Sequence, residues 1–127
     1  MQSLIGKYGS TLWEAPISKE DADWYNGGGP ERLSGHQGMI GKIIAEEGDI
    51  ITMYTPERTM QFFKREFHVY ETPDFSWGDK VRIIDKNIEG EISSFFWHFK
   101  TNQYFYFIKA NGKILKKRYR ALDLEKL

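Results

Sequence analysis

The sequence contains no cysteine, only four prolines and no long hydrophobic run. The absence of cysteine excludes disulfide bonds and thiolate metal sites. No stretch approaches the roughly 20 apolar residues of a membrane-spanning helix. The N-terminus also lacks a basic segment followed by an apolar run, which is the pattern of a signal peptide. We therefore expect a cytoplasmic protein with no membrane partner.

A net charge is absent as well, because 18 basic side chains balance 18 acidic ones. The balance is uneven along the chain. Residues 1–72 carry 7 Lys+Arg against 11 Asp+Glu, and residues 73–127 carry 11 against 7. Three explanations stay open: complementary charge between the halves, a basic face for an acidic partner, or solvated surface charge without a partner.

Aromatic residues are abundant, at 16% of the 127 residues. Because each aromatic side chain buries a large area, this composition suits a small fold with little core volume. The length fits one domain or two very small ones.

The first half of the chain combines one short helix with several strands. A helix is expected over residues 18–25, with Ser18 as its N-cap, and the segment 26–30, which holds three glycines and a proline, ends it. Runs rich in Ile, Thr and aromatic residues then predict strands over residues 39–45, 49–54, 58–64 and 66–70.

The second half reads as strands throughout, after a short linker at residues 71–74. Strands are expected over residues 79–84, 91–99, 103–109, 113–119 and 123–126. Asn111-Gly112 is a strong hairpin signal, because a tight primed turn requires positive φ at both central residues.

Five short strands with a tight turn before the last are typical of a Src-homology-3-like (SH3-like) small barrel. The fold class expected is therefore all-β, mainly antiparallel, with one short N-terminal helix and two SH3-like barrel units in tandem. We place the units at residues 1–72 and 73–127. The aromatic candidates for an interior shared by the units are Trp13, Trp24, Phe75 and Trp77.

The second half also resembles a family of small, uncharacterised bacterial proteins. The residues that carry the resemblance are Phe75, Gly78, Asp79, Val81, Gly90, Ile92, Trp97, His98, Phe99, Tyr106, Phe107, Gly112, Lys113, Lys117, Arg118, Tyr119, Asp123 and Leu124. The resemblance implies a C-terminal SH3-like barrel and assigns no activity.

Residues with catalytic or metal-binding chemistry form no motif. His36, His68 and His98 lie about 30 residues apart and match no metal-ligand spacing. The glycine run follows a helix instead of opening one, which argues against a phosphate-binding loop. We expect no catalytic residue, no metal and no cofactor.

Basic and aromatic residues gather near the C-terminus, where they define the candidate binding face. Its members are Trp97, His98, Tyr104, Tyr106, Lys117, Arg118 and Tyr119. On residues 103–109, strand alternation puts Tyr104 and Tyr106 on one side and Phe105 and Phe107 on the other. We expect the phenylalanine side to be the core and the tyrosine side to be wet.

Such a face indicates a non-catalytic binding module whose expected partner is a protein, because Tyr, Trp and Arg are favoured at interface centres. The alternative is a small barrel that binds nucleic acid by base stacking and phosphate neutralisation. A third hypothesis is an enzyme that uses His98 with a carboxylate. Two other possibilities stay open. Lys and Arg stems could merely cover aromatic edges, and exposed strand edges could pair to form a homodimer.

Overall fold

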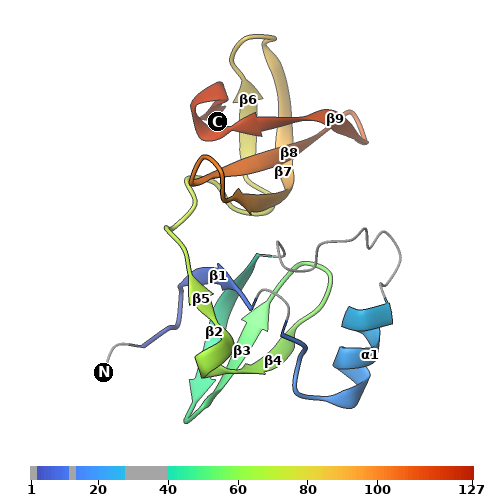
Figure 1. Ribbon diagram of the computed structural model, residues 1–127. Coiled ribbons are helices and arrows are strands. Elements are labelled where there is room, and N and C mark those ends of the chain that lie inside the picture. The colour runs from blue at the N-terminus through green and yellow to red at the C-terminus, as the bar shows by residue number, and fades with distance from the viewer. Residues whose placement is uncertain (1–2, 12–13, 28–39) are drawn as a thin grey trace. The chain divides into compact units, whose positions relative to one another are not determined.

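The computed structural model describes residues 3–11, 14–27 and 40–127 of the chain. It divides into two compact units, unit 1 at Met1–Thr72 and unit 2 at Pro73–Leu127 (Figure 1). Each unit is described by itself. In this part of the chain, no helix is long and apolar enough to cross a membrane.

Unit 1 is a five-stranded antiparallel sheet accompanied by one helix. Its elements are β1 (Tyr8–Ser10), α1 (Lys19–Gly27), β2 (Gly41–Glu47), β3 (Ile50–Tyr54), β4 (Met60–Phe63) and β5 (His68–Val69), with a 3-10 helix at Lys64–Glu66. The strand order is β4-β3-β2-β1-β5. The short N-terminal helix expected from the sequence is confirmed.

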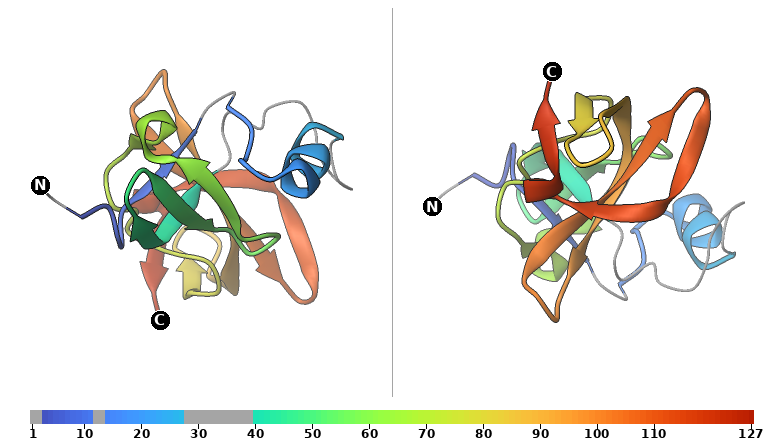
Figure 2. Two further views of the ribbon diagram at one scale, coloured as in Figure 1. Left: turned by 90° about the horizontal axis from the view of Figure 1, so that it is seen from below. Right: turned by 90° about the horizontal axis from the view of Figure 1, so that it is seen from above.

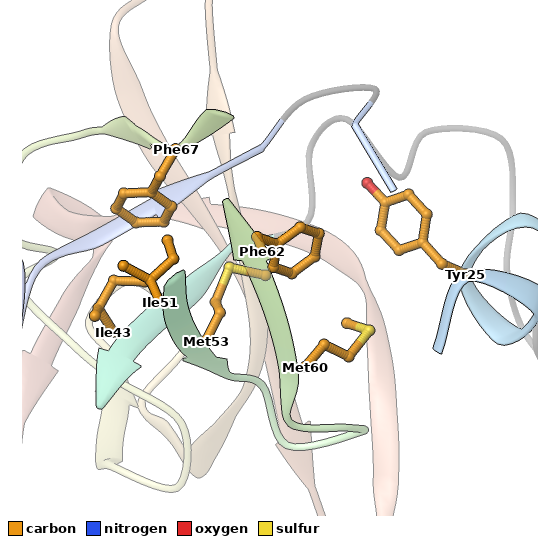
Figure 3. Close-up of a cluster of buried hydrophobic side chains, with 7 residues drawn as sticks. All are labelled: Tyr25, Ile43, Ile51, Met53, Met60, Phe62 and Phe67. Atoms are coloured by element: carbon orange, nitrogen blue, oxygen red, sulfur yellow. The ribbon is translucent and has the colours of Figure 1, made fainter. Parts of the chain in front are cut away.

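The core of unit 1 is made by alternate residues of its strands together with α1. Its buried members are Tyr25, Ile43, Ile51, Met53, Met60, Phe62 and Phe67 (Figure 3). Ile51 and Met53 are two residues apart on β3, so both point to the same side of the sheet. There they face Phe62 and Met60 of β4 in register. Unit 1 therefore has an interior of its own.

Helix α1 is capped and attached by side chains that the sequence places locally. The Ser18 hydroxyl accepts a hydrogen bond from the backbone N–H of Asp21 at 3.1 Å, which is the predicted cap. Arg58, in the loop between β3 and β4, donates from Nε to Asp21 at 2.7 Å and lies 5.4 Å from the Trp24 ring centroid. Asp21 also raises the pKa of Arg58 above its usual value. These contacts hold α1 beside the sheet.

Unit 2 is a second five-stranded antiparallel sheet. Its elements are β6 (Lys80–Ile83), β7 (Ile88–His98), β8 (Gln103–Ala110), β9 (Lys113–Arg120) and β10 (Leu124–Lys126), with a 3-10 helix at Ala121–Asp123. The order is β10-β6-β7-β8-β9. Asn111 and Gly112 have φ of 53° and 76°, which confirms the predicted tight turn between β8 and β9. This β8–β9 hairpin is the orange and red ribbon in Figure 2.

The two sheets share one topology. Counted within its own unit, each sheet has the order fifth, first, second, third and fourth strand. A 3-10 helix precedes the fifth strand in both units. The correspondence supports the arrangement of two similar units in tandem.

Closure into barrels is the part of the expected fold that the structure corrects. Among the described residues, no pairing joins β4 to β5 or β9 to β10, so both sheets are open. The fifth strands are too short to close them, because β5 has two residues and β10 has three.

Three of the four aromatic candidates for a shared interior have contacts within their own units. Trp24 packs against the core of unit 1. In unit 2, the Phe75 ring lies 5.5 Å from Tyr106, and the Trp77 ring lies 4.8 Å from Phe95. Trp13 lies outside the described residues.

Candidate binding surface

Strands β7, β8 and β9 carry all the candidate binding residues. The register places Phe96 opposite Phe105, and Tyr106 opposite Tyr119. Because neighbouring residues on a strand point to opposite sides of a sheet, these pairs define two different surfaces. We call the side of Tyr106 the inner side, since its residues are buried, and the side of Phe105 the outer side.

The tyrosines belong to the inner side, contrary to the prediction that their side is wet. Tyr106 is 1% exposed, Tyr119 is 3% exposed and Tyr104 is 6% exposed. The neighbouring Ile108 is fully buried on the same side. The tyrosine side is therefore the core of unit 2, and the phenylalanine side of β8 faces outward.

Tyr106 can be buried because both parts of its side chain are satisfied. Its ring lies 5.5 Å from Phe75 and 5.6 Å from Phe95. Burial raises the pKa of its hydroxyl to about 12, and hydrogen bonds with the backbone at Phe75 and Asp74 oppose that rise. A tyrosine buries nearly as much apolar surface as a phenylalanine once its hydroxyl has partners.

Trp97 and Lys117 also belong to the inner side. Trp97 is paired with Tyr104, and their ring centroids are 5.0 Å apart. The Lys117 ammonium lies 5.3 Å from the centroid of the Tyr119 ring, although its side chain remains exposed. Of the seven candidates, only His98 and Arg118 therefore lie on the outer side. The predicted face does not exist as one continuous surface.

The outer side carries a different aromatic cluster, which we call the outer aromatic face: Phe96, His98, Phe105, Phe107 and Arg118. The Phe96 ring centroid is 5.8 Å from that of Phe105 and 5.9 Å from that of Phe107, with planes tilted by 30° in both pairs. His98 stands edge-on to Phe105 at 4.8 Å. All four rings are half-buried, so part of each ring reaches solvent.

Arg118 covers this cluster from β9. It is paired with Phe107, and its guanidinium carbon lies 4.6 Å from the Phe105 centroid and 5.7 Å from that of Phe96. A guanidinium over aromatic rings is attracted to their electron-rich faces and is less strongly hydrated than an ammonium. The arginine is thereby placed over the aromatic rings in advance of any ligand.

The sequence segment that carries the outer aromatic face is basic. Residues 92–122 include no Asp or Glu, and their seven cations are Lys100, Lys109, Lys113, Lys116, Lys117, Arg118 and Arg120. Among the described residues, only Arg120 of these seven is in an ion pair, at 3.3 Å from Asp123. The acids of β6, β7 and β10 instead pair with Lys80 and Arg82. Most cations of the β8–β9 hairpin therefore have no ion pair within the described part of the unit.

The two histidines that the structure describes, His68 and His98, belong to different units. The ring of His98 is hydrogen-bonded through Nδ1 to the Thr101 hydroxyl at 2.7 Å. His68 is exposed on β5 of unit 1, and His36 lies outside the described residues. No group of three or more His, Asp or Glu side chains that could hold a metal occurs in residues 3–11, 14–27 and 40–127.

Unit 2 also has an open cavity of about 530 Å³ away from its histidine. Its lining includes Lys80, Glu91 and Lys109, together with the Asn111-Gly112 turn. His98 is not part of that lining. This cavity and its carboxylates are therefore not beside His98.

Sequence reasoning missed Phe96, Phe105 and Phe107 as surface residues. The sequence of β9 held a signal for which side of the sheet faces solvent, because Arg118 and Arg120 alternate there with Tyr119. Because cations favour the solvent side, this alternation indicates that the side opposite Tyr119 faces outward. Pairing of β9 with β8 then puts Phe105 and Phe107 on that side.

Comparison with known proteins gives a family but no function. The model of a family of unknown function, DUF6960, matches residues 31–125, and the chain belongs to this family. No curated protein and no solved structure matches the chain.

Proposed function

We propose that this protein is a non-catalytic binding module that engages an anionic macromolecule through the outer aromatic face of unit 2. The observation that carries the proposal is Arg118, an exposed cation held over two half-buried rings in a segment without acids. The proposal requires no cofactor or metal. It keeps the cytoplasmic setting that we expected from the sequence.

A binding role accounts for features that stability alone does not require. Three phenylalanines on the solvent side of a sheet leave apolar surface in contact with water, which folding does not favour. Six of the seven cations have no ion pair among the described residues, and like charges on adjacent strands and turns repel one another. A ligand that covers the rings and neutralises the cations removes both costs.

The expected class of partner changes with the corrected geometry. A protein was expected because Tyr104, Tyr106 and Tyr119 were placed at the surface, and these residues are buried. The outward residues are phenylalanines and mainly lysines, and lysine is depleted at protein interfaces. An acidic protein surface therefore becomes the second candidate, supported by the charge of the hairpin alone.

Retention on immobilised heparin tests binding to a polyanion without assuming its identity. We expect wild-type protein to be retained and the Arg118→Glu variant to elute at clearly lower salt. A variant that makes fewer contacts with the polyanion releases fewer counterions on binding and therefore binds more weakly. Lys86→Glu is the matched control, because Lys86 is an exposed residue between β6 and β7 and the change in charge is the same. Equal elution of both variants would refute the proposed face.

A further inference from the structure

We infer that the anionic macromolecule is a single-stranded nucleic acid whose bases stack on the outer aromatic face, an inference that rests on the proposed function. The juxtaposition behind it is an apolar aromatic platform beside a row of unpaired cations on the same hairpin. The cations can neutralise phosphates, and the aromatic platform can stack with bases. An acidic protein would use only the cations.

The chemistry of the platform fits bases that are read without regard to sequence. Phe96, Phe105 and Phe107 have no hydrogen-bonding groups in their side chains, so they offer π surface without selecting a donor or acceptor pattern. Stacking of bases on aromatic side chains tolerates any sequence, because every base has a π face. Arg118 can extend the platform, since a planar guanidinium stacks on bases as well as on rings.

The cations are placed to follow a phosphate backbone along the hairpin. Lys100 lies in the turn between β7 and β8, and Lys109 is an exposed residue two positions after Phe107 on β8, so alternation places Lys109 on the outer side. Lys116 is an exposed residue of β9 two positions before Arg118. Charges are thereby present at both ends of the aromatic cluster and beside it.

The length of the surface suits a short single strand. Strand β8 has eight residues, which is about 26 Å at about 3.3 Å per residue. That is enough for about four nucleotides, the lower end of the site size of small β modules that bind single strands. A duplex keeps its bases stacked on one another, so half-buried rings on a sheet cannot reach their faces.

The test compares ligands that carry equal charge with and without bases. The full chain is titrated by fluorescence anisotropy into labelled dT12, rU12, an abasic 12-mer with the same number of phosphates, a 12-bp duplex and poly-glutamate. We expect dT12 or rU12 to bind at least tenfold more tightly than the abasic strand and the duplex. The oligonucleotide that binds more tightly, dT12 or rU12, assigns the ligand as DNA or RNA.

Phe105→Leu keeps an apolar side chain of similar size and removes the aromatic face. We expect it to weaken binding of the preferred oligonucleotide by about 5- to 150-fold, the range for one lost base stack, and to leave binding of the abasic strand unchanged. Val69→Ala is the control, because Val69 is an exposed apolar residue on a strand of unit 1. Its affinity for the oligonucleotide should match that of wild type.

The outcomes separate this inference from the proposed function. Equal affinity for the abasic strand and the oligonucleotides overturns base stacking but leaves the polyanion-binding module standing. Tighter binding of poly-glutamate than of either oligonucleotide overturns the nucleic acid and assigns an acidic protein. A failure to bind any of the five ligands, together with no retention on heparin, refutes both proposals.

Discussion

Alanine at Tyr106 and alanine at Phe105 are expected to differ sharply in their cost, although the two residues are neighbours on β8. Tyr106 is 1% exposed and is surrounded by the rings of Phe75, Phe95 and Tyr104. Its truncation leaves a closed cavity, so we expect a loss of about 3–5 kcal/mol in the free energy of unfolding. Phe105 borders solvent, and its truncation should cost about 1–2 kcal/mol, because water fills the space that the ring leaves.

Urea denaturation followed by tryptophan fluorescence measures both losses. Unit 2 reports through Trp77 and Trp97, which contact Phe95 and Tyr104. The midpoints should shift in proportion to the losses, with similar slopes, if neither variant changes how much surface unfolding exposes. An equal or larger loss for Phe105→Ala would contradict the assignment of inner and outer sides, since the phenylalanine would then be the core residue.

Three further changes test the structure elsewhere. The pKa of Tyr106 is about 12 in the folded protein and about 10 in the unfolded chain, so the protonated hydroxyl contributes about 2–3 kcal/mol to the free energy of unfolding below pH 10, and this contribution disappears as the pH rises to 12. The Tyr106→Phe variant should therefore lose less stability than wild type between pH 10 and pH 12 in urea titrations. Identical pH profiles of the two proteins would exclude the effect. Gly90→Ala should cost about 1–3 kcal/mol in the same assay, because its Cβ would lie 2.6 Å from a carbonyl oxygen of β8, and an unchanged midpoint would show that the strands can separate there. Arg58→Ala should reduce the free energy of unfolding and the helical circular dichroism more than Lys19→Ala does. The first change leaves the carboxylate of Asp21 without its partner, whereas the side chain of Lys19 is 90% exposed. Equal effects of the two changes would mean that Arg58 does not attach α1.

Local signals predicted the elements well because their physics is local. Ser18 can cap a helix from its own position, and Asn111-Gly112 can adopt positive φ wherever it occurs. The expected helix and the hairpin between β8 and β9 were therefore right. Closure of the sheets depends instead on pairing between distant strands, which no local pattern determines, and that part was wrong.

The expectation that the tyrosine side is wet was wrong for a related reason. Alternation shows which residues share a side of a strand, but with Tyr and Phe alternating it does not show which side is buried. The prediction also grouped Trp97 with His98 and Lys117 with Arg118, although neighbours in a strand point to opposite sides. Irregularities between Ile92 and Ser94 and between Phe107 and Lys109 further shift the alternation along the hairpins.

Nuclear magnetic resonance of the side-chain N–H groups tests the central claim most directly, because Arg118 and Trp97 report on opposite sides of the same sheet. The protein is titrated with a soluble heparin fragment, and the Arg118 Nε–H and Trp97 indole N–H resonances are followed together. The outer aromatic face predicts that the arginine resonance moves in a saturable way while the indole resonance stays in place. Movement of the indole resonance with an unchanged Arg118 resonance would place binding on the inner side and contradict the account.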